Sequence, residues 1–486
     1  MPEPLLCQTV TGGTADEIRR ARDAALHADL VEVRLDSMTR PDAAAALADR
    51  RRPVIATCRP VREGGWFGGS EEERLRILDE ADALGAEFID VEWGARFEAI
   101  VRRRRGRGVI ISMHDFEGVP KDLVDRAAAM RSTGAEIVKI AVRVQALSDL
   151  LPLAAVARPA NPDAVLIGMG NAGVASRVLA ARFGNRWTYA GDEVAPGQLP
   201  AARLLQEFGF RRIRSDAALY GVVGRPVLHS LSPAMHNAGF AAVGLNAAYV
   251  PLEAADAADF RRFADAMGLR GASVTAPFKV PIVSHLDEIS PIAADVGAVN
   301  TIVITDRRLT GTNTDVEGFL DPLARRATIR GLRATVLGAG GAARAVAAAL
   351  VLEGATVTIV ARRVDEARAL AARFGARAAA WPPQAGSWDL LVNATTVGST
   401  ANPGQILAPA DLHAGLVYDL VYEPPQTPLL EAAQAAGCQT IGGLEMLVAQ
   451  AERQFELWTG QRPPKDLFAD AAAQALAARK DRFSLV

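Results

Sequence analysis

Short apolar runs alternate with longer stretches rich in alanine, arginine and leucine in the first part of the chain. The runs have the length of buried β-strands, and the stretches between them have the composition of helices. Strands that alternate with helices pair in parallel through right-handed crossovers, and eight such repeats are typical of a closed barrel. We therefore predict an N-terminal (β/α)8 TIM barrel in an α/β protein. Its strands are expected at Pro4–Val10, Leu30–Asp36, Pro53–Arg59, Glu87–Trp93, Gly108–Asp115, Ala135–Val142, Asp163–Gly170 and Trp187–Asp192.

Polar and charged residues interrupt these apolar strands, and they are interpreted as lying late in each strand. The active sites of such barrels lie at the carboxyl ends of the strands, so we expect these side chains to meet at one mouth. They are Glu32, Arg34, Arg59, Glu92, His114 and Lys139.

Lys139 is the most informative of them, because it lies inside the apolar run from Ile137 to Val142. No neighbouring carboxylate is evident, and burial without a counter-charge disfavours an ammonium, so we expect a neutral and nucleophilic amine. The alternative is a lysine at a strand end whose ammonium reaches solvent. A lysine, a histidine and arginines at one mouth together indicate a Schiff-base site for an anionic carbonyl substrate. Taken singly, His114 also fits a core histidine, and Arg34 and Arg59 fit ion pairs at the barrel rim.

A second unit is predicted after the barrel. The basic stretch from Arg211 to Asp216 is interpreted as a short linker, and an apolar strand is expected at Ala218–Val223. The segment Val336–Leu350, VLGAGGAARAVAAAL, is typical of a strand, a glycine-rich turn and a helix. Glycines let a backbone approach a pyrophosphate, and a helix N-terminus supplies amide donors, so this segment indicates a dinucleotide site.

The next expected strand, Ala355–Val360, is followed by Arg362 and Arg363. A site specific for NAD has Asp or Glu at this point, to bind the ribose hydroxyls. Two arginines favour the additional phosphate of NADP. The alternative is a pair of surface arginines at a strand end.

Between the linker and the glycine-rich turn lie several polar segments that a hydrophobic core would not require. A lysine and a carboxylate that converge on one hydroxyl can share its proton while a nicotinamide moves hydride at the attached carbon. The segments are HSLSP with Ser230 and Ser232, SVTAPFK ending at Lys279, GAVNT with Asn300, and GTNTD ending at Asp315. Tyr422 and Gln450, further along, fit a site or a structural role equally.

Composition narrows the class of protein. The chain has 486 residues, which suits two or three domains, and a net charge of −2, which does not favour a nucleic-acid binder. No signal peptide or membrane-spanning apolar stretch is present, so we expect a protein with no membrane association. Cys7, Cys58 and Cys438 lie far apart, which predicts neither a disulfide framework nor a zinc site and favours the cytoplasm.

The segments VEVRLD, CRPVREGG, SMHDF, IVKIAV, MGNAGVASR and APGQ, in this order, resemble type I 3-dehydroquinate dehydratases up to about Leu205. The resemblance implies that Lys139 forms an imine with 3-dehydroquinate and that His114 removes a proton for a syn elimination of water. Glu63 would orient His114 or tune its charge. Residues that would hold the substrate are Glu32, Arg34, Arg59, Arg177 and Gln198. Many family members have Ser or Thr where this chain has Val194, so one hydrogen bond of the lid loop would be missing.

The segments from about Tyr220 to beyond Trp458 resemble shikimate dehydrogenases. The resemblance implies that Lys279 and Asp315 are the catalytic pair. Residues that would bind shikimate or 3-dehydroshikimate are Ser230, Ser232, Thr275, Asn300, Tyr422 and Gln450. Residues that would bind NADP are Gly338, Ala339, Gly340, Gly341, Ala342, Arg362, Arg363 and Thr395. Ser273 and Ala361 replace residues that are commonly Asn, which shortens one side chain and weakens contacts on the adenine side.

The two resemblances support each other, because the product of the dehydratase is the substrate of the dehydrogenase. They imply a bifunctional enzyme with a barrel at 1–212, a substrate-binding domain at 217–320 completed by C-terminal helices at about 459–486, and a Rossmann NADP-binding domain at 321–458. A plastid form is not indicated, because no transit segment precedes Leu5. Three alternatives are a regulatory protein built from degenerate copies, a quinate-preferring relative and a purely structural protein. The intact Lys139 and the Lys279/Asp315 pair disfavour the first. Ser230, Ser232 and Thr275 disfavour the second, and the polar residues late in the barrel strands disfavour the third.

Overall fold

The computed structural model describes residues 3–157, 163–191, 194–384 and 386–483. The chain divides into two compact units, one of residues 1–219 with 246–267 and one of residues 220–245 with 268–486. The predicted domain boundaries stay predictions.

Eight parallel strands form the barrel of the first unit, in the order β7-β6-β5-β4-β3-β2-β1-β8. This confirms the predicted fold, and each predicted strand overlaps an observed one; Asp192, at the end of the last predicted strand, lies outside the described residues. The strands are β1 (Leu5–Val10), β2 (Leu30–Arg34), β3 (Val54–Thr57), β4 (Phe88–Glu92), β5 (Val109–Asp115), β6 (Ile137–Arg143), β7 (Ala164–Met169) and β8 (Trp187–Ala190).

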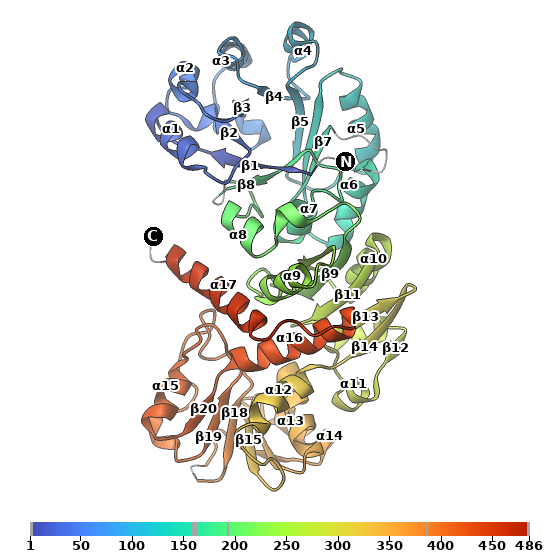
Figure 1. Ribbon diagram of the computed structural model, residues 1–486, viewed down its shortest axis with the longest axis vertical. Coiled ribbons are helices and arrows are strands. Elements are labelled where there is room, and N and C mark those ends of the chain that lie inside the picture. Colours follow the sequence, from blue (N-terminus) through green and yellow to red (C-terminus); the bar gives the residue numbers. More distant parts are fainter. Residues whose placement is uncertain (1–2, 158–162, 192–193, 385, 484–486) are drawn as a thin grey trace. The chain divides into compact units, whose positions relative to one another are not determined.

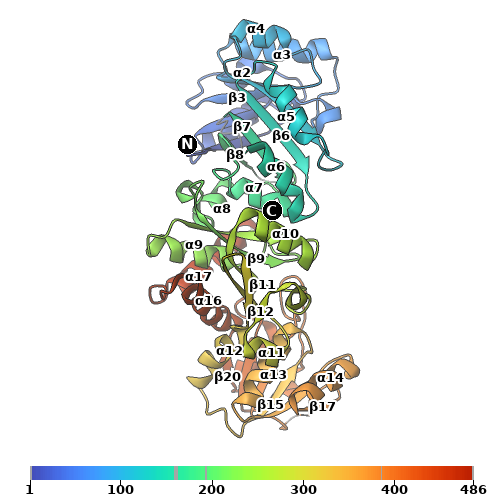
Figure 2. The same ribbon diagram turned by 90° about the vertical axis from the view of Figure 1, so that its right-hand side faces the viewer.

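Helices surround these strands, as Figures 1 and 2 show. Two of the helices begin with a capping box, in which Thr14 and Glu17, or Ser70 and Glu73, satisfy each other's backbone N–H groups. The helices are α1 (Ala15–Ala24), α2 (Ala43–Leu47), α3 (Glu71–Ala83), α4 (Glu98–Arg104), α5 (Leu123–Arg131), α6 (Leu150–Ala157), α7 (Val174–Val178) and α8 (Ala201–Gln206). Short 3-10 helices are η1 (Leu35–Ser37), η2 (Val61–Glu63), η3 (Leu147–Asp149), η4 (Asn171–Gly173) and η5 (Phe210–Arg212).

The predicted linker after the barrel begins in a short 3-10 helix. Its first two residues, Arg211 and Arg212, belong to η5, and Arg211 forms an ion pair with Asp29, 3.0 Å away. The basic residues therefore hold this segment to the barrel, which the charge pattern alone did not reveal.

Asn185 closes the barrel between β7 and β8. Its side-chain oxygen accepts a hydrogen bond from the N–H of Leu166 (2.8 Å), and its amide donates to the carbonyl of Leu166 (3.0 Å). The backbone groups of a strand residue normally bond to a neighbouring strand. On the β8 side of β7, the Asn185 side chain bonds to the N–H and the carbonyl of Leu166 instead.

Residues 246–267 pack within the same unit as the barrel. They form β10 (Ala247–Glu253) and α10 (Ala257–Met267). Asp259 of α10 is fully buried and accepts hydrogen bonds from the backbone N–H groups of Leu147 (2.8 Å) and Ser148 (2.9 Å) in η3. This carboxylate therefore holds the loop that follows β6.

The second unit contains strands of two sheets. In the first, β9, β11, β13, β14 and β12 lie in that order. These elements are β9 (Ala218–Gly224), α9 (Ser232–Ala242), β11 (Leu269–Val274), η6 (Pro281–His285), β12 (Glu288–Ile289), α11 (Pro291–Val296), β13 (Thr301–Thr305) and β14 (Arg308–Thr312).

The other sheet is parallel, in the order β17-β16-β15-β18-β19-β20, as the predicted Rossmann unit requires. Neighbouring residues of β15 point to opposite faces: Val336 packs with Val346 of α13, and Leu337 packs in the cluster that contains Leu429 of α15. The elements are α12 (Asp315–Ala324), β15 (Arg333–Leu337), α13 (Gly341–Leu352), β16 (Thr356–Val360), α14 (Val364–Phe374), β17 (Arg377–Ala379), β18 (Leu390–Asn393), η7 (Pro409–Asp411), β19 (Leu416–Asp419), α15 (Pro428–Ala435), β20 (Gln439–Ile441), α16 (Gly443–Thr459) and α17 (Leu467–Phe483).

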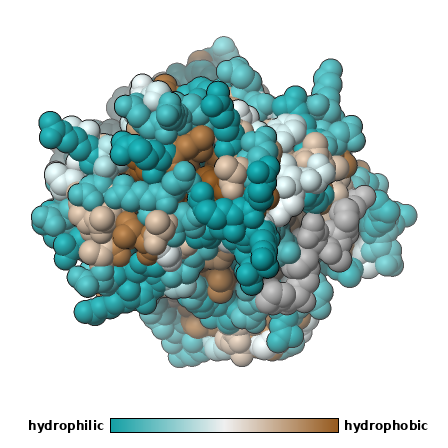
Figure 3. Space-filling view, turned by 90° about the horizontal axis from the view of Figure 1, so that it is seen from above, coloured by the Kyte–Doolittle hydropathy of each residue, from teal (hydrophilic) through white to brown (hydrophobic). Residues whose placement is uncertain are grey.

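In the part of the chain that the structure describes, no helix is both long and apolar enough to span a membrane. The face turned to the viewer in Figure 3 is mostly hydrophilic, with small separate hydrophobic patches.

Replacing Asn185 by alanine tests the closure of the barrel. Asn185→Ala leaves two buried backbone groups of Leu166 without partners, so we expect the free energy of unfolding to fall by about 2–4 kcal/mol. Urea denaturation followed by tryptophan fluorescence measures it. The same substitution at the exposed Asn171 is the control and should change the value by less than about 0.5 kcal/mol. An equal effect of both substitutions would contradict the role of Asn185.

Candidate active sites

Lys139 extends into the barrel from β6, and its side chain is buried. Its Nζ lies 3.0 Å from Oε1 of Glu32 and 2.9 Å from Oδ2 of Asp90, with the ring of Tyr189 4.4 Å away. The expectation of an amine without a neighbouring carboxylate is therefore wrong, and so is the alternative of a solvent-exposed ammonium. These partners come from β2 and β4, far from Lys139 in the chain.

The prediction that the polar residues lie late in their strands is wrong for two of them. Lys139 is the third of seven residues in β6, and Glu32 is the third of five in β2. Strands of a barrel are staggered, and the register aligns Lys139 with Ser112, which in turn aligns with Glu92, the last residue of β4. The stagger therefore brings Lys139 level with the carboxyl end of a neighbouring strand.

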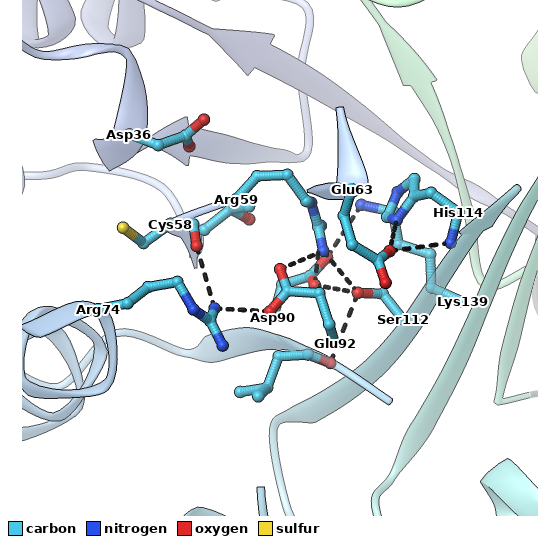
Figure 4. Close-up of polar contacts among 12 residues, drawn as sticks. Asp36, Cys58, Arg59, Glu63, Arg74, Asp90, Glu92, Ser112, His114 and Lys139 are labelled. Atoms are coloured by element: carbon cyan, nitrogen blue, oxygen red, sulfur yellow. Dashed lines mark hydrogen bonds and ion pairs between the residues drawn. The ribbon is translucent and has the colours of Figure 1, made fainter. Parts of the chain in front are cut away.

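Arg59 lies between two buried carboxylates, as Figure 4 shows. It is 2.9 Å from Asp90 and 2.7 Å from Glu92, and Glu92 is also paired with Arg74 at 2.6 Å. Burial acts to raise the pKa of Asp90, but the charges of Arg59 and Lys139 outweigh it and hold the pKa below its ordinary value. Asp90 is therefore a fixed negative charge beside the amine.

His114, near the end of β5, contacts Glu63 of η2. Oε2 of Glu63 lies 3.1 Å from Nδ1 of the ring and accepts a hydrogen bond from the backbone N–H of His114, also at 3.1 Å. This is the contact that the family resemblance implied. A carboxylate on Nδ1 favours the tautomer in which Nε2 is free to accept a proton.

The ionisation of this pair follows from its surroundings. Burial, with the positive charges of Arg59 and Lys139, lowers the pKa of His114 well below its ordinary value. Burial raises the pKa of Glu63 to about 7, although Arg59 opposes the shift. At neutral pH the imidazole is therefore uncharged, which is the form that can act as a base.

Gln198 joins the cluster around Lys139 through Thr9. The amide of Gln198 donates to Oγ1 of Thr9 (3.2 Å), which donates to Oε2 of Glu32 (3.1 Å). Gln198 also fixes its own loop, since its side-chain oxygen accepts from the N–H of Ala195 (3.1 Å). The structure thus brings Lys139, Glu32 and Gln198 together, as predicted.

Two predicted arginines have other contacts. Arg34 forms a bidentate pair with Asp36 (3.0 and 2.7 Å) and stacks on Trp66, and its role toward substrate stays a prediction. Arg177 is buried and donates to the carbonyl of Pro196 (3.1 Å), and burial lowers its pKa to about 10. Among the described residues no carboxylate pairs with Arg177, so its guanidinium retains capacity for an anion.

A second polar site contains Lys279, Asp315 and Asn300. Lys279 lies beyond the end of β11, Asp315 begins α12, and Nζ of Lys279 is 2.5 Å from Oδ2 of Asp315. Asn300, just before β13, donates to the other oxygen of Asp315 at 2.7 Å. The predicted lysine and carboxylate therefore meet, and Asn300 orients the carboxylate.

Helix α16 covers this site with two glutamines. The amide of Asn300 lies 3.5 Å from Oε1 of Gln450. One turn later, Gln454 accepts a hydrogen bond from the hydroxyl of Ser273 (2.7 Å) and donates to Thr301 (2.9 Å). Ser273 therefore keeps a hydrogen-bonding role at this position.

Four further predicted substrate residues lie near the ends of strands or helices of the second unit. Ser230 and Ser232 flank the start of α9, where the hydroxyl of Ser230 accepts from the N–H of Ser232 (3.2 Å). Thr275 follows β11, and Tyr422 follows β19, where burial raises the pKa of the phenol. Their contacts with substrate stay predictions.

The glycine-rich turn has the form that a dinucleotide requires. Gly338 has a φ of 110°, and a Cβ there would lie 3.1 Å from both the carbonyl of Ala394 and the side chain of Thr395. A Cβ on Gly340, by contrast, would meet nothing within 4 Å. At Gly341 it would approach Lys279 to 3.4 Å. The turn therefore lies beside the lysine of the Lys279–Asp315 pair.

The remaining predicted cofactor residues border this turn. Ala339 and Ala342 are half-buried within it, while Arg362 and Arg363 are exposed just beyond β16. Arg363 pairs with Glu366 at 2.8 Å, as a surface arginine would. The N–H of Gly338 donates to the carbonyl of Val360, so the end of β16 lies next to the turn.

Comparisons with known proteins agree along the chain. The family models for type I 3-dehydroquinase, for the shikimate dehydrogenase substrate-binding domain and for the shikimate 5'-dehydrogenase C-terminal domain match residues 6–215, 222–302 and 443–473. A chloroplastic bifunctional 3-dehydroquinate dehydratase/shikimate dehydrogenase of Arabidopsis thaliana is 34% identical over 96% of this chain and 83% of its own length.

This chain belongs to the bifunctional 3-dehydroquinate dehydratase/shikimate dehydrogenase family. An NADP-dependent shikimate dehydrogenase of Oleidesulfovibrio alaskensis is 45% identical over 54% of this chain and 98% of its own. The solved shikimate dehydrogenase of Thermus thermophilus, in complex with NADP(H) and shikimate, is 39% identical with a TM-score of 0.50, covering 53% of this chain and 99% of its own. Another, in complex with NADP+, reaches 0.52 at 35% identity, over 54% and 97%.

Sequence reasoning missed several residues of this bifunctional protein. Asp90 and Tyr189 contact the amine of Lys139 directly, and Gln454 connects α16 to Ser273. Asp90 carries a signal that could have found it, because it is a charge inside a predicted apolar strand, as Lys139 is. Tyr189 carries none, since an aromatic residue in a strand is ordinary.

The raised pKa of Glu63 predicts how stability depends on pH. Between about pH 4.5 and 7 the folded protein keeps a proton on Glu63 that the unfolded chain has lost. The contribution of Glu63 to the free energy of unfolding therefore decreases as the pH rises from about 4.5 to 7. Glu63→Gln lacks the effect. We expect its stability relative to the parent to increase by about 2–3 kcal/mol between pH 4.5 and 8, because each unit corresponds to about 1.4 kcal/mol and partial exposure screens it.

Urea denaturation at the two pH values measures this difference. Glu72→Gln, at an exposed position of α3, is the control and should differ from the parent by a constant amount within about 0.5 kcal/mol. A constant difference for Glu63→Gln would show that Glu63 ionises normally.

Proposed function

We propose that this chain catalyses two consecutive reactions, the dehydration of 3-dehydroquinate to 3-dehydroshikimate in the barrel and its NADPH-dependent reduction to shikimate in the second unit. The observation that carries the proposal is the contrast between two lysines. Lys139 is buried between two carboxylates, whereas Lys279 is half-buried and has a single partner, Asp315. The first environment suits a covalent amine and the second suits proton transfer.

In the barrel, Nζ of Lys139 attacks the ketone carbon, the carbonyl oxygen leaves as water, and an iminium forms. The nitrogen carries a positive charge as an ammonium and again as an iminium, so Glu32 and Asp90 stabilise both states. Tyr189 adds the face of its ring. The neutral amine that attacks is a transient form between these two charged states.

His114 then removes the proton from the carbon beside the iminium. Its uncharged ring can accept this proton on Nε2, since Glu63 occupies Nδ1. The electrons move into the iminium and return to expel the hydroxyl on the next carbon, which takes the proton from Nε2 of His114 and leaves as water; hydrolysis of the imine then releases the product. Arg177, which lacks a carboxylate partner among the described residues, is the proposed site for the substrate carboxylate. Arg34, Arg59 and Gln198 are proposed to hold the rest of the substrate.

In the second unit, Lys279 is proposed to donate a proton to the carbonyl oxygen of 3-dehydroshikimate. Asp315 holds the ammonium, and Asn300 fixes the carboxylate from its other side. Ser230, Ser232, Thr275, Tyr422 and Gln450 are proposed to bind the substrate.

NADP fits the residues beside this pair. The positive φ of Gly338, the open space at Gly340 and the first turn of α13 suit a pyrophosphate. Arg362, exposed at the end of β16, is the proposed partner of the additional phosphate, with Arg363 and Thr395 nearby. Bound NADPH supplies hydride to the carbonyl carbon. The closeness of Lys279 to Gly341, where an added Cβ would lie 3.4 Å from the lysine side chain, supports a reaction at this junction.

We further propose a cytoplasmic location, which the three free cysteines support because a reducing compartment keeps thiols unpaired.

A crossed pair of substitutions tests the assignment of the two lysines. Lys139→Ala should lower the dehydratase kcat by at least about 1,000-fold and leave the reduction of 3-dehydroshikimate unchanged, because the covalent route is lost. Lys279→Met should lower the dehydrogenase kcat by about 100- to 10,000-fold and leave the dehydratase unchanged. Enone absorbance follows the first reaction and nicotinamide absorbance the second.

Two exposed lysines provide matched controls for this experiment. Lys121→Ala in the barrel and Lys465→Met in the second unit should leave both activities unchanged. A variant that loses both activities, or the wrong one, would overturn the assignment.

Reductive trapping tests the imine itself. Borohydride added with 3-dehydroquinate should attach the substrate to Lys139 as a stable amine, because it reduces the iminium that joins them. Substrate that is bound without a covalent bond is lost when the protein is denatured. Peptide mass spectrometry should show the added mass on the peptide that contains Lys139 and not on the one that contains Lys121. Labelling that persists in Lys139→Ala would rule out this nucleophile.

A further inference from the structure

Asp419 is a fully buried carboxylate at the end of β19, outside the sites assigned above. In the parallel sheet it is aligned with Asn393, the last residue of β18, which is also fully buried. The carboxyl ends of parallel strands carry the loops that bind ligands in a Rossmann sheet. A charged group without solvent at this position therefore requires an explanation.

Among the described residues, three donors form hydrogen bonds with the Asp419 carboxylate. One oxygen accepts from the amide of Asn393 (2.9 Å) and from the N–H of Val421 (3.0 Å). The other accepts from the hydroxyl of Thr427 at 2.6 Å. Since all three partners are donors, the anion satisfies them fully, and no neutral side chain of this shape does so.

Through Asn393 the carboxylate is connected to the loop after β18. The side-chain oxygen of Asn393 accepts from both the N–H (3.0 Å) and the hydroxyl (2.7 Å) of Thr395, and its amide also donates to the carbonyl of Val397 (3.1 Å). Thr395 in turn lies against Gly338 of the glycine-rich turn. The position of this loop therefore depends on the orientation of the Asn393 amide, which Asp419 fixes.

Through Thr427 the carboxylate is connected to the loop after β19. The hydroxyl of Thr427 accepts from the N–H of Leu430 and so caps α15. With Val421 bonded to one oxygen and Thr427 to the other, both ends of the segment from Val421 to Thr427 are held by one side chain. Tyr422 lies in this segment.

We propose that Asp419 is a positioning residue of the dehydrogenase, which sets the loop of Thr395 and the loop of Tyr422 relative to each other. The proposal rests on the roles assigned to Thr395 and Tyr422 under the proposed function. Because one carboxylate holds both loops, its loss displaces the nucleotide contact and the substrate contact together. Burial raises the pKa of Asp419 to about 6, so the anion that makes these bonds predominates at neutral pH.

Substitution of Asp419 with kinetic analysis tests this coupling. We expect Asp419→Ala to weaken NADP+ binding, measured by calorimetry, by about 10-fold and to lower the dehydrogenase kcat by about 10- to 100-fold, since small displacements of positioned groups have effects of this size. Asp419→Asn keeps the shape and one accepting oxygen and should restore part of both losses. Thr427→Val removes the bond to the second oxygen and the cap of α15 but leaves the bonds from Asn393 and Val421 intact, so it should lower kcat with a smaller effect on NADP+ binding.

Two controls separate positioning from a merely structural role. The barrel dehydratase of each variant reports whether the protein is intact and should be unchanged. Asp389→Ala removes a carboxylate from the opposite end of the same sheet, where Asp389 pairs with Arg333, and should alter neither NADP+ affinity nor kcat.

The outcomes are distinct. If Asp419→Ala and Thr427→Val lower the urea midpoint but leave NADP+ affinity and kcat at parental values, Asp419 is only structural and the proposal is overturned. If Asp419→Ala does not fold, Thr427→Val alone decides, and parental kinetics in that variant overturn the proposal. Thr395→Ala and Tyr422→Phe test the underlying roles separately: unchanged kinetics in those two variants refute the proposed function of these residues, whatever Asp419 does.

Discussion

The compensation of buried charge is the constraint on which the barrel site depends. An ammonium at Lys139 is tolerated in the barrel because Asp90 and Glu32 face it, and Asp90 is tolerated because Arg59 faces it. The series continues outward through Glu92, Arg74 and Glu71, so that opposite charges alternate from the site to the helix layer. Removing one member leaves a neighbour buried without a partner, which is far costlier than losing a surface pair.

The same physics explains why the two lysines differ. Lys139, held between two carboxylates, suits a nitrogen that stays cationic, as the proposed iminium requires, whereas Lys279 has one carboxylate and partial access to solvent. Its neighbour across the site is the first turn of α13, where a helix N-terminus favours a bound phosphate. Position in the fold, rather than residue type, determines whether a lysine is suited to form a bond or to move a proton.

Parallel strands give both units a common way to build a site. The carboxyl ends of parallel strands lie at one edge of the sheet, so the topology itself brings together side chains that are far apart in the sequence. Asp419 and Asn393 illustrate a second use of this edge. They bind no ligand in the proposed mechanism, yet their hydrogen bonds join the two loops that do.

The sequence by itself determined the eight barrel strands, the glycine-rich turn and most of the polar residues at the sites, because these depend on local periodicity and on residues adjacent in the chain. Even the pairing of His114 with Glu63 followed from a family resemblance. Only the tertiary structure decided that Lys139 has two carboxylate neighbours, that strand stagger brings it level with the end of β4, and that Arg34 is paired with Asp36. Asp90 and Asp419 act through contacts between strands whose register no single segment specifies, and register is set by the packing of the whole sheet.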